Sequence, residues 1–280
     1  MKNHLELFSG THSFGKVSCK KYNVVSLDMN LDEKCPFTDY VSKNHIKEDI
    51  MTWDYKNYKI KNFDLITASP VCLWWSTLRN TWIGRKLKAH GDKIITKEIL
   101  QEDIDKYGKP MVDKVIEIIE YFKPKYWIIE NPQTGKMKHY IKEKYPNYNI
   151  FYDFDYCKYS NFGYKKRSRF WTNIKDIKPL LCKNDCENML FINNQKIHKE
   201  RMGTSKTVID NEKIIRVNTK KKREKYKDFE NIQQKSKLHK ISLGSWGKKG
   251  TSQIGIGGGN NRLERYRIPE KLIECLLEKT

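Results

Sequence analysis

Several features that define other classes of protein are missing from this sequence. No apolar stretch is long enough to cross a membrane, and the start at Met1 leads into a strand-like run without an apolar signal region. The seven cysteines follow no framework spacing, which argues against a disulfide scaffold. No internal repeat is visible. We therefore expect a soluble, intracellular protein of a reducing compartment, the cytoplasm or nucleus, and not a secreted or membrane protein.

Negative charge is scarce relative to positive charge. The 280 residues include 55 Lys and Arg but only 34 Asp and Glu, which gives a formal net charge of +21. Such a surplus attracts polyanions, so nucleic acid is the partner that the composition favours. A lysine-rich composition also accompanies an AT-rich genome, and the abundance of Asn, Ile and Tyr fits that explanation equally well.

The first part of the chain alternates between short apolar runs and helical or loop segments. The runs predict six strands, at 4–8, 24–28, 63–68, 125–130, 150–156 and 169–173. The clearest helix is 110–122, where apolar residues recur at helical spacing. This alternation predicts an α/β fold with a mostly parallel sheet and helices on both faces. The segment 73–109 is too long for a bare connector, so we interpret part of it as a functional loop.

The composition changes near residue 175. The following region carries basic clusters such as Lys220–Arg223, few apolar runs and a glycine-rich stretch at 255–259. The chain then closes with an amphipathic segment, 268–277, that has proline near its start. We expect a catalytic domain over 1–174, a small basic lobe over 175–262, and a C-terminal helix within 263–280 that packs back on the first domain.

Cys72 is the leading candidate for chemistry because of its position. It follows the apolar run 63–67 directly, at the carboxyl end of a predicted strand, and Pro70 fixes the backbone before it. Most single cysteines are small buried apolar residues. In open α/β sheets, however, ligands bind at the carboxyl ends of the strands, and Cys72 falls there.

Other polar groups are predicted at the same edge. The turn 8–15 brings backbone amides close to a ligand, and Asp28 ends the next strand, where it can accept from ribose hydroxyls. Glu130 ends the apolar run 126–129. Arg167 and Arg169 alternate along a strand and so face one side, which suits a phosphate or a ring carbonyl. Each has a simpler alternative. The turn with Asp28 can be an ordinary strand-to-helix turn, Glu130 a solvated strand end, and the two arginines part of a solvated edge strand.

In this order, the pieces resemble the cytosine-C5 DNA methyltransferases, especially the compact versions carried by phages and large DNA viruses. The matching stretches cover most of residues 5–173 and read LFSG at 7–10, SLD at 26–28, SPVC at 69–72, IENPQTG at 129–135 and RSRFWTN at 167–173. The sequence departs from the family pattern at four places. The family usually has a second glycine where this chain has His12, and a second proline where it has Val71. It usually has a valine at the position of Pro132 and a glutamine at that of Lys165. Tyr266–Pro269 is a candidate for the family's final motif.

The resemblance implies a Rossmann-like fold that uses S-adenosylmethionine as cofactor. The implied cofactor-binding residues are Phe8, Ser9, Gly10, Thr11, His12, Ser13, Gly15, Asp28, Met29, Asp49 and Pro70. It further implies Cys72 as the nucleophile, Glu130 as the group that grips the target cytosine, and Arg167 and Arg169 as supporting groups. The segment 73–109 then includes a loop that closes over the flipped base.

The resemblance also implies the partners. The substrate is double-stranded DNA with the target cytosine flipped out. The protein is expected to act as a monomer and to bind no membrane. If it is viral, it is expected in the cytoplasm or nucleus of the host. The region after 175 then takes the position of a target-recognition lobe, where Trp246 and the glycines at 255–259 line a groove. RNA, such as tRNA, is an alternative substrate for the same residues. A nucleic-acid-binding protein with a decayed catalytic site is a second alternative, for which His12 and Lys165 are the best indications.

One group of cysteines raises the question of a metal. Cys182, Cys186 and His198 offer three zinc ligands, and Cys157 offers a fourth. The spacing is loose and no second close pair of cysteines follows. From the sequence alone we assign no metal to the protein.

Overall fold

The computed structural model describes residues 1–280 apart from 31–32, 36, 60, 202–205 and 236–265. The chain divides into two units. Unit 1 comprises Met1–Phe154, Arg167–Pro179 and Ile268–Thr280, and unit 2 comprises Asp155–Lys166 and Leu180–Arg267. The part of the predicted basic lobe at 236–262, with Trp246 and the glycine-rich stretch 255–259, lies outside the described residues.

Unit 1 is built on a seven-stranded sheet with the order β3-β2-β1-β4-β5-β7-β6. The strands are β1 (Lys2–Leu7), β2 (Tyr22–Leu27), β3 (Asn44–Ile46), β4 (Leu65–Ala68), β5 (Tyr126–Pro132), β6 (Phe151–Asp155) and β7 (Arg167–Thr172). The pairs from β3 to β5 are parallel, and β7 runs antiparallel to β5. All four residues of β4 are buried, as expected of a parallel strand covered on both faces. The predicted α/β class is therefore confirmed.

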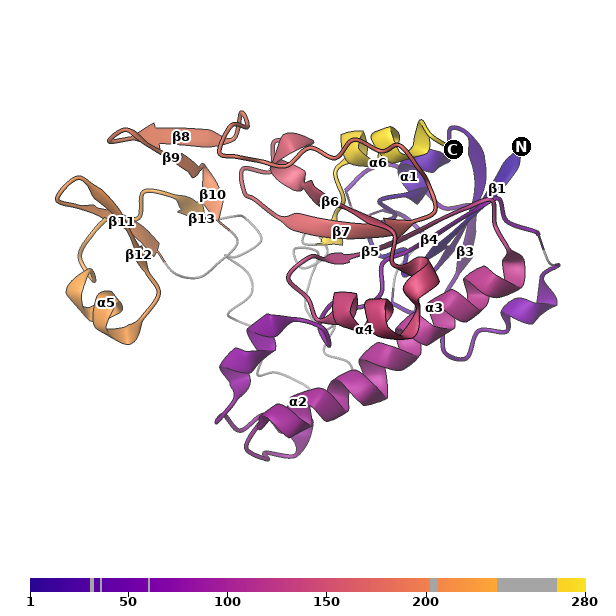
Figure 1. The fold of residues 1–280 in the computed structure, drawn as a ribbon, viewed down its shortest axis with the longest axis horizontal. Coiled ribbons are helices and arrows are strands. Elements are labelled where there is room, and N and C mark those ends of the chain that lie inside the picture. The colour runs from indigo at the N-terminus through magenta and orange to yellow at the C-terminus, as the bar shows by residue number, and fades with distance from the viewer. Residues whose placement is uncertain (31–32, 36, 60, 202–205, 236–265) are drawn as a thin grey trace. The chain divides into compact units, whose positions relative to one another are not determined.

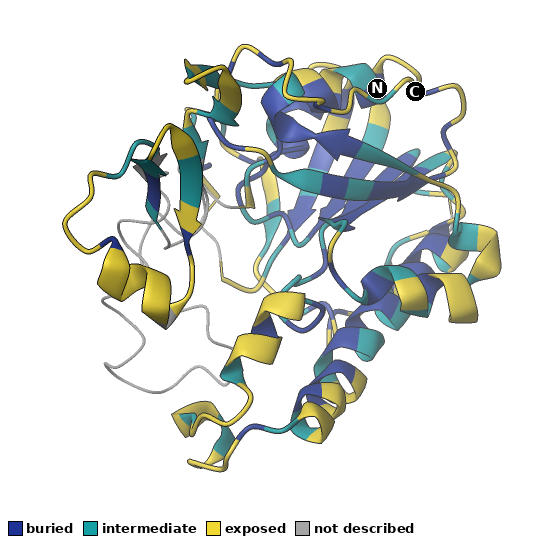
Figure 2. Ribbon diagram, turned by 60° about the vertical axis from the view of Figure 1, so that its left-hand side comes forward, coloured by how far each residue is buried: buried dark blue, intermediate teal, exposed yellow. Residues whose placement is uncertain are grey.

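Helices cover both faces of this sheet (Figure 1). One face carries α1 (Gly15–Ser18) and α6 (Glu270–Leu277), and the other carries α3 (Lys109–Phe122) and α4 (Met137–Lys144). The buried side of α3 meets the sheet and its outer side is exposed (Figure 2). Among the described residues, no helix combines the length and apolar character needed to cross a membrane.

The C-terminal helix is tied to the first helix of unit 1. The Lys16 ammonium donates to the Glu270 carboxylate at 2.7 Å, and the backbone N–H of Ile268 donates to Ser13 Oγ at 3.1 Å. Leu272 and Leu276, on the inner side of α6, are fully buried. The last residues of the chain therefore brace the turn that follows β1.

The segment after Cys72 is folded. It contains α2 (Lys97–Asp103) and a π-helical turn, Ile104–Gly108, that leads into α3. Arg79 and Asp103 are both buried and form an ion pair, and His90 Nε2 lies 2.9 Å from the same carboxylate. The Arg79 guanidinium also lies 5.2 Å from the ring centre of Trp74. A buried arginine that pairs with a carboxylate and stacks on a ring fixes the start of the segment to its end.

The described part of unit 2 consists mainly of short strands. Its elements are β8 (Met189–Ile192), β9 (Gln195–His198), β10 (Glu200–Arg201), β11 (Lys206–Asp210), β12 (Lys213–Val217), α5 (Lys220–Lys225) and β13 (Gln234–Lys235). Val208, Val217 and Tyr226 form one small buried cluster. Three cysteines form another, with Met189 packed against it. Apolar clusters this small contribute little to stability compared with the core of unit 1.

Candidate active site

The predicted site residues gather at one edge of the sheet because of its topology. Strands β1 to β5 are parallel, so their carboxyl ends share an edge, and the antiparallel β7 begins at that edge. The residues that reach this edge are those of the turn 8–15, Asp28, Asp49, Cys72, Glu130 and Arg167. They come from six different strand ends, which the sheet topology places at one edge.

Two hydrogen bonds join the loop of Cys72 to the end of β5 and to the segment that follows it. Asn131 Nδ2 donates to the carbonyl of Pro70 at 2.9 Å, and the backbone N–H of Lys136 donates to the carbonyl of Trp75 at 2.8 Å. Cys72 is half-buried between these two anchor points. The loop that carries the thiol is therefore fastened to the end of β5, the strand that carries Glu130.

Glu130 is buried near the end of β5, with 7% of its surface exposed. The pairing of β5 with β7 places Glu130 opposite Phe170 and places Asn131 opposite Arg169. Paired residues share a face of the sheet, so Glu130 lies on the face of Phe170, and Arg169 on that of Asn131. The joint action of Glu130 and Arg169 on one ring stays a prediction.

Arg169 is held by the edge strand β6. Its guanidinium donates twice to the Asp153 carboxylate, with N–O distances of 2.7 and 2.8 Å, and lies 3.5 Å from the ring centre of Phe151. Arg167 is half-buried at the start of β7, where its carbonyl accepts from the N–H of Gln133 at 3.2 Å. Sequence reasoning missed Asp153, because nothing near it in sequence indicates which strand pairs with β7.

The turn after β1 has an unusual backbone. Phe8, Gly10 and His12 all have positive φ, at 54°, 50° and 48°. His12 is fully buried, and it takes the left-handed conformation that glycine adopts more readily. The turn is thus built without a second glycine, at a conformational cost that the surrounding contacts must offset.

Glu6 supplies much of that support from β1. Its Oε1 accepts from the backbone N–H groups of Phe14 and Gly15, both at 3.0 Å, and its Oε2 accepts from Ser26 Oγ at 3.2 Å. Oε2 also lies 3.7 Å from His12 Nδ1. Sequence reasoning missed Glu6, although a carboxylate inside the buried strand Leu5-Glu6-Leu7 was a visible signal of an internal partner.

Gly15 packs tightly against this carboxylate. A Cβ at residue 15 would lie 2.5 Å from Glu6 Oε2 and 3.2 Å from the Tyr40 hydroxyl. We expect Gly15→Ala to lower the free energy of unfolding by about 1–3 kcal/mol through overpacking. Urea titration of the variant measures this loss.

Gly84→Ala is the matched control for Gly15→Ala. Gly84 has a φ of 80° and nothing within 4 Å of an added Cβ, so only backbone strain of about 1–2 kcal/mol applies there. A smaller loss at residue 15 than at residue 84 would contradict the tight contact.

Asp28 and Ser9 provide polar groups that suit a nucleoside. The Asp28 carboxylate accepts from the backbone N–H groups of Gly10 at 3.2 Å and Asn30 at 2.9 Å. Burial raises the pKa of Asp28, while these two hydrogen bonds oppose the rise. Ser9 Oγ is buried and has no hydrogen-bond partner in the described part of the chain. A buried hydroxyl without a partner, next to a carboxylate with remaining acceptor capacity, fits the ribose and amino acid groups of S-adenosylmethionine.

The remaining predicted cofactor residues have mixed surroundings. The hydroxyls of Thr11 and Ser13 lie 2.7 Å apart and hydrogen-bond to each other, so they also serve the structure of the turn. Met29 is 41% exposed, directly after Asp28. The Asp49 carboxylate accepts from the backbone N–H of Met51 at 3.0 Å, in the turn after β3. Their roles toward the cofactor remain predictions.

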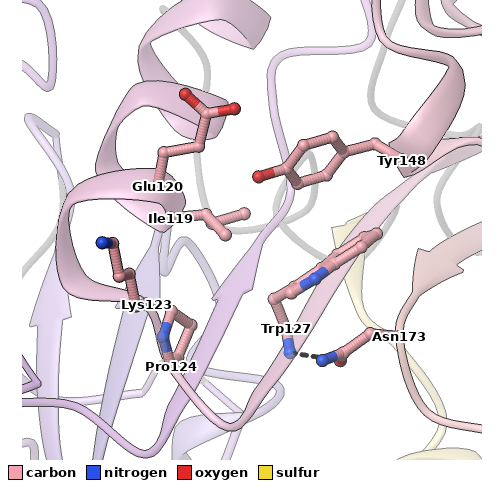
Figure 3. A pocket seen from close by; sticks show the side chains of 7 residues that line it. All are labelled: Ile119, Glu120, Lys123, Pro124, Trp127, Tyr148 and Asn173. Carbon is pink, nitrogen blue, oxygen red and sulfur yellow. Dashed lines mark hydrogen bonds between the residues drawn. The ribbon is translucent and has the colours of Figure 1, made fainter.

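Two cavities lie elsewhere in unit 1. The one drawn in Figure 3 has a volume of about 330 Å³ and is lined by Glu120, Tyr148 and Trp127, whose N–H donates to Asn173 at 3.0 Å. It lies at the amino end of β5, away from the edge that carries Cys72. A second cavity of about 530 Å³ is lined by β3 and the segment that follows it, including Trp53. Neither is lined by Cys72 or Glu130, so neither defines the reaction site.

The sheet order, with its single antiparallel strand among the described pairs, and the polar groups at the carboxyl edge define a Rossmann-like methyltransferase fold. No family model matches the chain. Over 188 residues the chain is 40% identical to the Probable DNA (cytosine-5)-methyltransferase of Frog virus 3 (isolate Goorha). The matched stretch covers 66% of this chain and 78% of that protein. The chain therefore belongs to the DNA (cytosine-5)-methyltransferase family. The family predicted from the five sequence stretches is confirmed, and this relative is viral, as the resemblance led us to expect.

Solved structures with similar folds include two other methyltransferases. The S. pombe Dnmt2 methyltransferase is 16% identical, with a TM-score of 0.40, over 66% of this chain and 52% of that one. The Entamoeba histolytica methyltransferase EhMeth is 17% identical, with a TM-score of 0.41, over 65% and 56%. The chain spans a little over half the length of these two proteins.

Proposed function

We propose that this protein transfers a methyl group from S-adenosylmethionine to carbon 5 of cytosine in DNA. The observation that carries the proposal is the adjoining position of the Cys72 loop and the end of β5, joined by the hydrogen bond from Asn131 to Pro70. Family membership supports the same reaction. The turn after β1, with Ser9 and Asp28, would hold the cofactor.

Cys72 would act as a nucleophile toward the cytosine ring. Carbon 5 is a weak nucleophile, and bonding of the Cys72 sulfur to carbon 6 pushes electron density onto it. When bound, the cofactor supplies a methyl group activated by a positively charged sulfur. After the new carbon–carbon bond has formed at carbon 5, loss of the carbon 5 proton to a base lets the bond between sulfur and carbon 6 break. The thiolate is then regenerated.

Glu130 would hold the ring during this addition. A buried carboxyl group can hydrogen-bond ring N3 and the exocyclic amine of cytosine, and so stabilise the charge that develops as sulfur adds. Arg167 would support the ring from the start of β7. Arg169 would act through its fixed position on Asp153, as a group that organises this end of the sheet.

The substrate would present its base outside the helix. Carbon 5 and carbon 6 of a stacked cytosine are not accessible to groups on both faces of the ring, so the base must be flipped out of the duplex. The folded segment 73–109, which begins directly after Cys72, is suited to cover such a base. Exposed lysines of α5 in unit 2 supply positive charge for phosphate contacts.

Transfer of a labelled methyl group tests this proposal. The purified protein is incubated with labelled S-adenosylmethionine and either duplex DNA or tRNA, and the nucleic acid is then digested to nucleosides. We expect label in 5-methylcytosine from DNA. Label only in RNA would show that RNA is the substrate, and no label in either would indicate a binding protein without catalysis.

A further inference from the structure

Four metal-ligating side chains meet in unit 2, outside the site described above. They are Cys157, Cys182, Cys186 and His198, and each offers one ligand atom within 4.8 Å of the others. All three cysteines are buried and His198 is half-buried. We propose that these residues bind one zinc ion that holds unit 2 together.

The geometry of the cluster matches a tetrahedral zinc site. His198 Nε2 lies 3.5 Å from Cys182 Sγ and 3.4 Å from Cys186 Sγ. Zinc bonds of about 2.3 Å to sulfur and about 2.0–2.1 Å to nitrogen, at tetrahedral angles, separate the two ligand atoms by about 3.6 Å. The two distances from His198 Nε2 therefore match edge lengths of a coordination tetrahedron. Three thiolates and one imidazole form a closed, structural type of zinc site.

The local fold explains how distant residues reach this cluster. Asn193 and Asn194 have positive φ values of 47° and 58°, as a two-residue hairpin turn requires. This turn folds β9 back along β8, so that His198 pairs with Met189 and returns to the cysteine loop. Cys157 arrives separately, on a 3-10 turn (Tyr156–Lys158) of the first segment of unit 2.

Hydrogen bonds from neighbouring groups hold the cysteines of the cluster in place. Backbone N–H groups of Asn184 and Asp185 hydrogen-bond to Cys182, and that of Asn188 hydrogen-bonds to Cys186. The Asn188 amide also donates to the carbonyl of Cys157 at 3.1 Å, which links the two segments. Such outer hydrogen bonds orient metal ligands.

Two lysines lie beside the cluster, and each is paired with a carboxylate. Lys165 donates to the carbonyl of Cys182 at 2.8 Å and lies 3.5 Å from the Asp155 carboxylate. Lys158 acts electrostatically on Cys182 and Cys186 and pairs with Asp185 at 3.1 Å. The apolar clusters of Cys157 and of Val208, in the described part of unit 2, are small, and a metal ion would add a cross-link to this packing.

Metal content of the full chain tests the proposal. We expect about one zinc per chain by elemental analysis of protein purified without chelator. Replacement of zinc by Co²⁺ should produce the visible bands of a tetrahedral site and a strong sulfur-to-metal charge-transfer band. Protein with no zinc, with iron in its place, or without the charge-transfer band after Co²⁺ loading would overturn the proposal.

Two variants and a control connect the metal to these residues. Cys182→Ser should lower the zinc content at least about tenfold, whereas Cys275→Ser, on α6 of unit 1, should retain all of it. His198→Cys should retain zinc and change the Co²⁺ spectrum to that of four sulfur ligands. Full zinc in Cys182→Ser, or an unchanged Co²⁺ spectrum in His198→Cys, would contradict the assignment. If Cys182→Ser does not fold, the wild-type and His198→Cys measurements still decide.

Discussion

Replacing Cys72 with serine should abolish methyl transfer to DNA, with a loss of at least about a thousandfold in rate. The hydroxyl of serine is a far weaker nucleophile than a thiolate, and carbon 5 stays unreactive without addition at carbon 6. The side chain is half-buried and nearly isosteric with serine, so the fold should persist. Initial rates with labelled cofactor measure the effect, and cofactor binding by calorimetry should remain close to that of the wild type.

Cys19→Ser is the matched control, because Cys19 is an exposed thiol at the end of α1, away from the edge of the sheet that carries Cys72. It should retain full activity. A DNA containing 5-fluorocytosine adds an independent readout, since fluorine leaves carbon 5 with no proton to lose and the protein should stay bonded to the base. Covalent capture by Cys72→Ser, or substantial turnover by it, would show that another group is the nucleophile.

The second large effect is expected at Glu130. Glu130→Gln should lower the methylation rate by about a hundredfold to a thousandfold, because a neutral amide stabilises the charge developing on the ring less well. The side chain is buried and Gln keeps its volume, so stability should change little by comparison. Single-turnover rates separate this loss from weaker DNA binding.

Glu143→Gln controls for the loss of a carboxylate, since Glu143 is exposed on α4. It should match the wild type in rate. Equal rates for Glu130→Gln and Glu143→Gln would remove Glu130 from the proposed reaction and leave only a structural role for it.

Much of the framework could be predicted because apolar runs record burial directly. The six predicted strands correspond to β1, β2, β4, β5, β6 and β7, within a few residues at each end. The helix predicted at 110–122 spans Lys109–Phe122, because its buried positions repeat at helical spacing. The strand β3 was missed, since Asn44-His45-Ile46 is short and has no fully buried residue. The helices α2 and α4 were also missed, because they bury few residues and leave a weak periodic signal.

The site could be predicted as an ordered set of strand ends, but its contacts could not. That Cys72 and Glu130 reach one edge follows from parallel strands, which the apolar runs indicate. The pairing of Arg169 with Asp153 depends on which strand neighbours β7, and no local pattern encodes that choice. The same limit applies to Cys157, which belongs to the cysteine and histidine cluster although it precedes Cys182 by 25 residues.

The turn after β1 has a consequence for how relatives of this protein can be found. A histidine occupies a backbone shape that usually selects glycine, and an internal acid on the preceding strand braces it. Any search that demands the second glycine would pass over such chains, although their geometry is intact. A search for the backbone dihedral angles of this turn, combined with an acid two residues before it, would recover relatives that sequence motifs overlook.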